Sequence, residues 1–267
     1  MFIQIIMTAG LLVGTSKVFA DPVIPTSRVP DIVGHPDDLE DGTQYVQSSR
    51  KKLFAKTGLV IVPTTTIPSD YFLDAVTTVI NQGLSDNARK KLTRLQYVMA
   101  DDSISKRGVE AYYSHDLNAL IIGQTSGVKS ANPTHHLART WSVIAHEIGH
   151  AYVLSSLSAE SLAFLARRFG PWRLNAVDSG AHLFSSQFFR PHPLFGAPAG
   201  VINKLENSPS RYALQNVHEW FAECFSSMVK KKLRDQGLIP DLRSSSDMNV
   251  RPLSAALQAW FHENVTN

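Results

Sequence analysis

The sequence predicts an α+β fold, with a small β-sheet formed early in the chain and helices after it. Short runs of β-branched and apolar residues occur between positions 59 and 122, and they are typical of strands. Longer segments, most of them after position 135, repeat apolar residues with a helical spacing. Strands that precede a mainly helical part are typical of the α+β class.

The composition is consistent with one domain that has a substantial core, or with one domain that carries a small subdomain. The chain has 267 residues, of which 43% are hydrophobic and 18% are charged, so its body is not typical of a disordered protein. The formal net charge is +3, and no dense basic run is interleaved with aromatic residues. We therefore expect no nucleic-acid partner. The single cysteine, Cys224, excludes an intramolecular disulfide.

The first 20 residues predict a signal peptide, and therefore a secreted, extracellular protein. The apolar run from Phe2 to Val13 is too short to span a bilayer. Val18 and Ala20, which precede Asp21, suit cleavage by signal peptidase after Ala20. No lysine or arginine precedes the apolar run, so a buried N-terminal helix or an uncleaved anchor is the alternative. We expect no stable membrane insertion.

Residues 21–57 predict a loosely ordered N-terminal arm. They are rich in Pro, Asp, Ser and Gln and show no sustained period. The basic triplet at positions 50–52 is a candidate processing site, so the arm is either a pro-segment or a surface extension. The compact domain is expected to cover residues 58–267.

The individual elements follow from apolar spacing and from Gly, Pro and Ser at their ends. Strands are expected at residues 59–62, 95–100, 109–113 and 119–122, the last two joined as a hairpin. Helices are expected at residues 69–83, 85–92, 136–155, 159–169, 215–234 and 253–262. The helix at 136–155 is apolar on all sides and should be buried. The stretch 172–211 is rich in Pro, Gly and Phe and should be irregular.

One motif within the buried helix carries the chemistry. It reads His146-Glu147-Ile148-Gly149-His150. Residues four apart share a helix face, so both imidazoles can bind one zinc ion while Glu147 borders the same site. A pair of satisfied core histidines is the alternative. Histidines and a glutamate in an apolar helix, however, cost desolvation free energy that a metal would offset.

A catalytic zinc ion needs a third protein ligand and an open position for water. Glu219 and Glu223 lie one turn apart in the aromatic-rich helix expected at 215–234. One carboxylate can bind the metal while the other accepts the second ring N–H of a ligand histidine. His218 is a competing ligand, although adjacent helix positions point about 100° apart, so it cannot easily share a site with Glu219.

These features together resemble the catalytic domain of anthrax lethal factor and the secreted Pro-Pro endopeptidases built on that domain. The resemblance rests on the histidine motif, the hairpin before it, and Tyr212, which lies seven residues before a glutamate followed by aromatic-aromatic-Ala-Glu. It covers about residues 59–232, and its specific part is the two helices. It implies a zincin-like fold, in which an edge strand lies beside the buried active-site helix.

The resemblance also implies a role for each site residue. His146, His150 and Glu219 would bind Zn²⁺, Glu147 would be the catalytic base, Tyr212 would stabilise the oxyanion, and Glu223 would hold a ligand histidine. Without the resemblance, the alternative is that Tyr212 is a surface tyrosine before a helix. The interval from His150 to Glu219 is longer than the family pattern, and 172–211 is the expected insertion.

The expected reaction is hydrolysis of a peptide bond, with Glu147 passing a proton from the attacking water to the leaving amine. The strand at 119–122 is expected to offer an edge to an extended peptide. A set of phenylalanines either walls the cleft or covers the core: Phe184, Phe188, Phe189 and Phe195.

The sequence thus predicts a secreted zinc endopeptidase that acts on a protein or peptide substrate as a toxin or effector. The Pro-Pro endopeptidases imply proline beside the cleaved bond. An exopeptidase is an alternative, but no charged pocket for a free terminus can be read. A metal-stabilised binding module is another alternative. Glu147 counts against it, because a structural site needs no base and usually closes its fourth position.

Overall fold

The computed structural model describes residues 44–62, 70–106, 109–123, 133–175, 177, 181–202, 205–239 and 253–267. The chain divides into two compact units. The first combines Met1–Leu73 with Leu95–Val128, and the second combines Asp74–Arg94 with Lys129–Asn267. The signal peptide expected at residues 1–20 lies outside the described residues.

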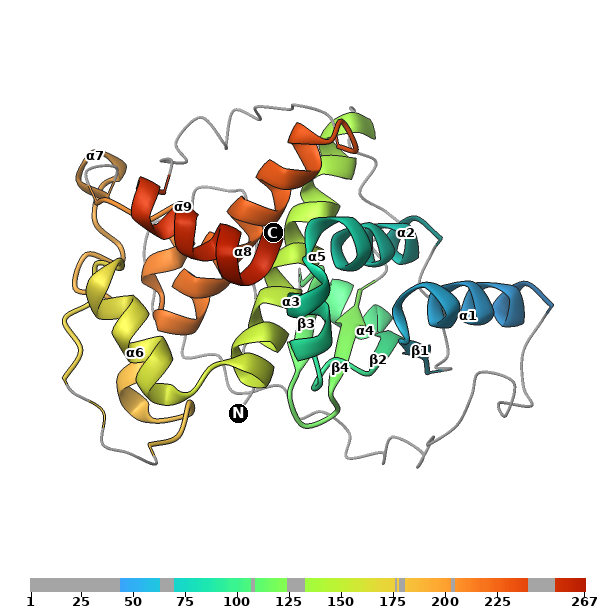
Figure 1. Ribbon diagram of the computed structural model, residues 1–267, viewed down its shortest axis with the longest axis horizontal. Coiled ribbons are helices and arrows are strands. Elements are labelled where there is room, and N and C mark those ends of the chain that lie inside the picture. The colour runs from blue at the N-terminus through green and yellow to red at the C-terminus, as the bar shows by residue number, and fades with distance from the viewer. Residues whose placement is uncertain are drawn as a thin grey trace. The chain divides into compact units, whose positions relative to one another are not determined.

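The described part of the first unit contains a four-stranded mixed sheet, so the α+β class is confirmed. The strands are β1 (Val60–Ile61), β2 (Tyr97–Ala100), β3 (Ala111–Ser114) and β4 (Ala119–Ile122) (Figure 1). Their order is β1-β2-β4-β3, in which β1 and β4 both run parallel to β2, and β3 is antiparallel to β4. All the side chains of β4 are buried, which explains its continuous apolar sequence.

The expected hairpin is formed by β3 and β4. Residues 115–118 make the turn, and Asn118 ends it with a φ of 49°, in the left-handed region. Asparagine tolerates this conformation better than most residues, because its short polar side chain hydrogen-bonds locally. The register that results pairs Ser114 with Ala119 and Ala111 with Ile122.

The expectation that residues 119–122 offer a free edge is wrong. Along its whole length, β4 pairs with β2 on one side and with β3 on the other. Strand addition needs a strand whose backbone N–H and C=O groups are unpaired on one side. The outer strands of the described sheet are β1 and β3, so an extended peptide would have to pair with one of these two.

Two helices of the first unit were not expected. Helix α1 (Gln44–Thr57) lies within the segment for which a loosely ordered arm was predicted. It shows little apolar periodicity, but Leu53 is buried, and the Thr57 hydroxyl donates to the Leu53 carbonyl and accepts the N–H of Leu59. Helix α4 (Asp102–Lys106) has too few residues to show a helical period. The arm is therefore helical over α1.

Helices make up most of the described second unit. They are α3 (Asp86–Lys91), α5 (Pro133–Ser156), α6 (Ala159–Arg168), α7 (Ala199–Ile202), α8 (Val217–Asp235) and α9 (Ala255–Phe261). Two short segments are π-helical, η2 (Val79–Gly83) and η6 (His262–Thr266). Two are 3-10 turns, η3 (Ser186–Phe189) and η4 (Tyr212–Leu214). Helix α2 (Asp70–Thr78) contains the point in the chain where the first unit ends.

The expected helices are confirmed, with ends displaced by at most a few residues. The stretch expected to be irregular, 172–211, contains only short helical segments among its described residues. In the described part of the chain, no helix has the length and apolar character needed to cross a bilayer.

Side-chain caps explain where several helices begin. Ser85, Ser158 and Ser254 cap α3, α6 and α9, and each hydroxyl accepts the N–H of the residue three positions on. Asn216 caps α8 in the same way, with its Oδ1 2.9 Å from the backbone nitrogen of Glu219. This cap fixes the first turn of α8, where Glu219 lies.

Helices α5 and α8 pack against each other in the second unit (Figure 1). Their contact is the most extensive between any two described elements. Gly149 permits the close approach, because a Cβ atom there would lie 3.1 Å from Cα of Ala222 and 3.2 Å from the Phe225 side chain. The faces of α5 and α8 that carry the candidate site residues therefore meet in a buried interface.

Candidate metal centre

The two histidines of the motif lie in the interior of α5. They are one turn apart, and the Nε2 atoms of His146 and His150 are 3.0 Å from each other. Both side chains are buried, with exposed fractions of 3% and 1%. The helix spacing therefore brings both imidazoles to one point, as the sequence predicted.

Helix α8 supplies a carboxylate to the same point. Oε2 of Glu219 lies 3.0 Å from Nε2 of His146 and 3.4 Å from Nε2 of His150. Glu219 is fully buried. The buried group of His146, His150 and Glu219 could hold a metal ion.

The geometry of this group fits a tetrahedral divalent ion. Bonds of about 2.0–2.1 Å to a tetrahedral zinc ion place its ligand atoms about 3.3–3.4 Å apart. The observed separations of 3.0, 3.0 and 3.4 Å differ from that value by a few tenths of an ångström. In addition, Oε1 of Glu219 is buried and accepts no hydrogen bond from the described residues. Two imidazole nitrogens and a carboxylate oxygen are a common donor set for catalytic zinc.

Electrostatics around the group favour a cation. Burial opposes the charged form of His146, but the hydrogen bonds to Glu219 and Glu223 and the charges of these two carboxylates together outweigh burial and raise the pKa of His146 to about 10. Burial also opposes ionisation of Glu219, but the two imidazoles lower its pKa to about 2. Burial lowers the pKa of His150, which is therefore neutral at pH 7. A metal ion that binds here would displace the proton of His146.

The structure separates the two glutamates of α8. Oε1 of Glu223 lies 2.9 Å from Nδ1 of His146, on the other side of the ring from Glu219. Burial raises the pKa of Glu223, but the hydrogen bond and the charge of His146, together with Ser210 and Lys230, outweigh burial and lower it. Metal-ligating histidines usually donate their second ring N–H to a carboxylate of this kind. Glu219 thus lies with the ligand atoms, and Glu223 lies where it can orient the imidazole.

Glu147 follows His146 on α5 and is fully buried. Its charge contributes to the raised pKa of Tyr212, so the two side chains lie near each other. A carboxylate next to a metal-binding group is a candidate general base.

Turn η4 places Tyr212 in front of α8 and beside the ligand group. Its ring centroid is 5.9 Å from that of His146, and its hydroxyl lies near the carboxylates of Glu219 and Glu147. Burial, and then the charges of Glu219 and Glu147, raise the pKa of Tyr212 well above its usual value. The phenol therefore keeps its proton at neutral pH and can act as a hydrogen-bond donor.

The competing ligand His218 has a different set of contacts. Its Nε2 lies 2.8 Å from the carbonyl oxygen of Leu183, and its ring stacks on Phe189 with centroids 4.9 Å apart. Burial lowers the pKa of His218 to about 4, so the ring is neutral and donates to the Leu183 carbonyl. It does not belong to the group of ligand atoms.

The phenylalanines of the expected insertion have different environments. Phe188 is fully buried and covers the core, whereas Phe195 is 45% exposed. Phe184 and Phe189 are half-buried and stack on each other, with centroids 6.4 Å apart. The stack continues to His218 on α8.

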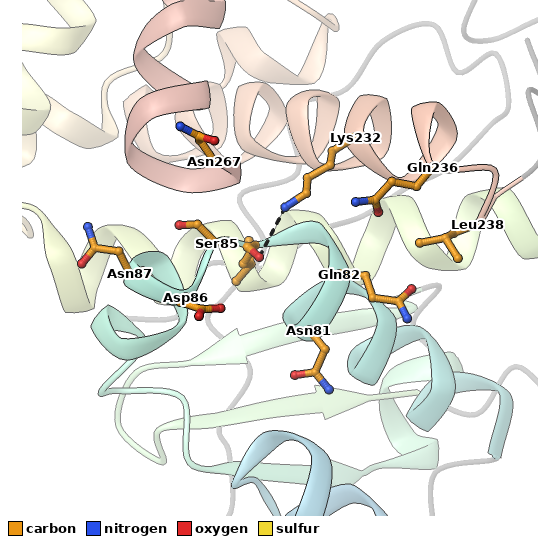
Figure 2. Close-up of a pocket in the computed structure, with 10 residues that line it drawn as sticks. Asn81, Gln82, Ser85, Asp86, Asn87, Lys232, Gln236, Leu238 and Asn267 are labelled. Atoms are coloured by element: carbon orange, nitrogen blue, oxygen red, sulfur yellow. Dashed lines mark hydrogen bonds between the residues drawn. The ribbon is translucent and has the colours of Figure 1, made fainter.

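A separate groove of about 760 Å³ lies elsewhere in the second unit. Figure 2 shows its mostly polar lining, which includes Asn81, Asp86, Lys232 and Gln236. Lys232 is held there by the carbonyl oxygens of Leu84 and Thr266. None of the residues of the ligand group lines this groove, so it is distinct from the metal centre.

Two residues near the site, Asn216 and Ser210, were not identified from the sequence. Asn216 caps α8, and Asn three residues before Glu at the start of a helix is a recognisable cap pattern. Ser210 hydrogen-bonds to Glu223 and accepts the N–H of Ala213. It lies in an irregular segment, where no periodic pattern could have marked it.

Comparisons of the chain with known protein families, with curated proteins and with solved structures give no match.

Proposed function

We propose that this protein is a secreted zinc-dependent endopeptidase. The observation that carries the proposal is the convergence of His146 Nε2, His150 Nε2 and Glu219 Oε2 from two packed helices in a buried site. Two further observations support it. Glu147 lies on the same helix as the histidines, and Tyr212 lies against the ligand group with its proton retained.

In the proposed reaction, a peptide bond is hydrolysed by water. A bound zinc ion would supply Lewis acidity, which acidifies water and polarises the carbonyl of the substrate. Glu147 takes a proton from the attacking water, whose oxygen bonds to the carbonyl carbon. Glu147 then delivers that proton to the amine as the C–N bond breaks. Tyr212 donates its O–H to the oxygen that becomes negative, a contribution typically worth about 10²–10³ in rate.

The proposal includes a zincin-like fold and a relationship to the lethal factor type of metallopeptidase. The order of the site residues, His146 to His150, then Tyr212, then Glu219 and Glu223, supports a zincin-like fold of the lethal factor type. If the secreted Pro-Pro endopeptidases are the right relatives, the substrate carries proline beside the cleaved bond. Action as a toxin or effector is part of the same proposal.

The proposal is tested with the purified chain and a library of internally quenched peptides, with and without chelator. We expect zinc-dependent cleavage within the peptides and enrichment of proline near the cut. Cleavage that releases only terminal residues would indicate an exopeptidase. Zinc binding without turnover would indicate a metal-stabilised binding module. Cleavage without enrichment of proline would remove the Pro-Pro relationship and leave the endopeptidase assignment standing.

A further inference from the structure

Ser210 lies at the junction of two parts of the candidate site. Its side chain hydrogen-bonds to the Glu223 carboxylate, which in turn lies 2.9 Å from Nδ1 of His146. Its Oγ also accepts the backbone N–H of Ala213 at 3.1 Å. Ala213 is the middle residue of η4, the turn that begins with Tyr212.

We infer that Ser210 is a positioning residue that couples the metal centre to the turn that carries Tyr212. One hydroxyl group links the carboxylate that orients His146 to the backbone that sets the place of the phenol. The inference rests on the proposed function, because it concerns how the metal ligands and the oxyanion donor Tyr212 are positioned relative to each other.

The donor and acceptor roles of the Ser210 hydroxyl follow from its two partners. An ionised carboxylate only accepts hydrogen bonds, so Ser210 donates its O–H to Glu223. Its lone pairs then remain available for the N–H of Ala213. Hydrogen bonds to charged groups are stronger than neutral ones, so the bond to Glu223 fixes the hydroxyl and, through it, η4. Among the natural side chains, threonine can replace both contacts and alanine can replace neither.

The alternative is that Ser210 only stabilises its own loop. Ser208 provides the matched control, because its hydroxyl donates to the carbonyl oxygen of Ser210 at 3.3 Å and belongs to the same loop. Removal of the Ser208 hydroxyl should therefore loosen the loop to a similar extent. It leaves the contact between Ser210 and Glu223 in place.

The first test measures zinc alone. The affinity of the metal-free full-length protein for Zn²⁺ is determined by competition with a chromophoric chelator. A direct partner of a ligand histidine typically contributes about 10–100-fold to metal affinity, and Ser210 acts one bond further away. We expect Ser210→Ala to weaken zinc binding by about threefold to tenfold. Ser210→Thr and Ser208→Ala should each stay within about twofold of the unchanged protein.

The second test measures turnover at saturating zinc, where the change in metal affinity no longer contributes. With one internally quenched peptide that the unchanged protein cleaves, Ser210→Ala should lower kcat more than it raises KM. In a Tyr212→Phe background the same substitution should have little further effect on kcat, because the donor that Ser210 positions is already absent.

Each outcome decides between the two accounts. If Ser210→Ala matches Ser208→Ala in zinc affinity, or if its effect on kcat is fully additive with that of Tyr212→Phe, Ser210 is only a loop residue. Should Ser210→Ala not fold, Ser210→Cys takes its place with the same expected direction, because a thiol is a weak donor and acceptor. If the unchanged protein binds no zinc, the proposed function and this inference both fail. If it cleaves peptides normally and only the Ser210 variants behave as controls, the inference fails alone.

Discussion

Oε1 of Glu223 lies 2.9 Å from Nδ1 of His146, on the side of the imidazole that faces away from Glu219. The ring is thus held between two carboxylates, one for each nitrogen. This arrangement fixes which nitrogen of His146 faces the ligand group, because Glu223 accepts the N–H of the other one.

The two glutamates should therefore respond differently to substitution. Glu219→Ala removes a ligand atom, so the protein should purify without zinc. Glu223→Ala should retain the metal at saturating zinc and weaken its binding by roughly 10–100-fold. Elemental analysis and zinc titration measure both effects. The reverse pattern would make Glu223 the ligand, and loss of zinc only in His218→Ala would make the histidine the ligand.

Substitution of the candidate base should separate binding from turnover. Glu147→Gln preserves the shape of the side chain but cannot accept a proton, so zinc content and thermal unfolding should be unchanged while nearly all turnover is lost. The comparison requires the same peptide and equal zinc occupancy in both proteins. Turnover close to that of the unchanged protein would mean that another group acts as the base.

Tyr212→Phe removes only the hydroxyl of the phenol. We expect unchanged zinc content, with kcat reduced by about 10²–10³ and KM changed much less, as for a donor that acts mainly in the transition state. Steady-state kinetics on one peptide measures this. If kcat does not change, Tyr212 is only a residue that precedes α8.

The packing of α5 against α8 gives a prediction about stability. Gly149→Ala would place a Cβ atom 3.1 Å from the backbone of Ala222, so the two helices must shift. Overpacking of this kind typically destabilises a protein by about 1–3 kcal/mol, and here it also moves the ligands of α5 away from Glu219. Denaturant unfolding and zinc affinity should therefore both weaken. Gly200→Ala, where the Cβ meets open space, is the control and should be nearly neutral.

The long helices and the position of the histidine motif could be predicted because they depend on local spacing. A histidine at i and another at i+4 must share a face of α5, whatever the rest of the fold does. The buried length of α5 and the aromatic-rich part of α8 are similarly visible as apolar patterns.

Tertiary relationships could not be predicted in the same way. Glu219 and Glu223 lie on the same face of α8, and only the packing of that face against α5 decides which carboxylate reaches Nε2 of His146. In the sheet, β4 lies between β2 and β3. The sequence indicates the hairpin with β3, but it does not indicate that β4 also pairs with β2. Among residues 51–57 of α1, whose burial the structure describes, only Leu53 is buried, and the weak apolar periodicity of the helix makes its sequence resemble that of a loop.

The central claim is that His146, His150 and Glu219 together bind zinc, and metal content measured alongside thermal unfolding tests it most directly. The purified chain should contain one zinc ion per molecule. A chelator should remove it and lower the melting temperature, because a ligand at about 100 times its Kd stabilises the folded state by about 2.7 kcal/mol. Addition of zinc should restore both values, and the His146→Ala variant should show no response. A protein purified without chelator that contains no transition metal, and whose unfolding zinc does not affect, would contradict the account.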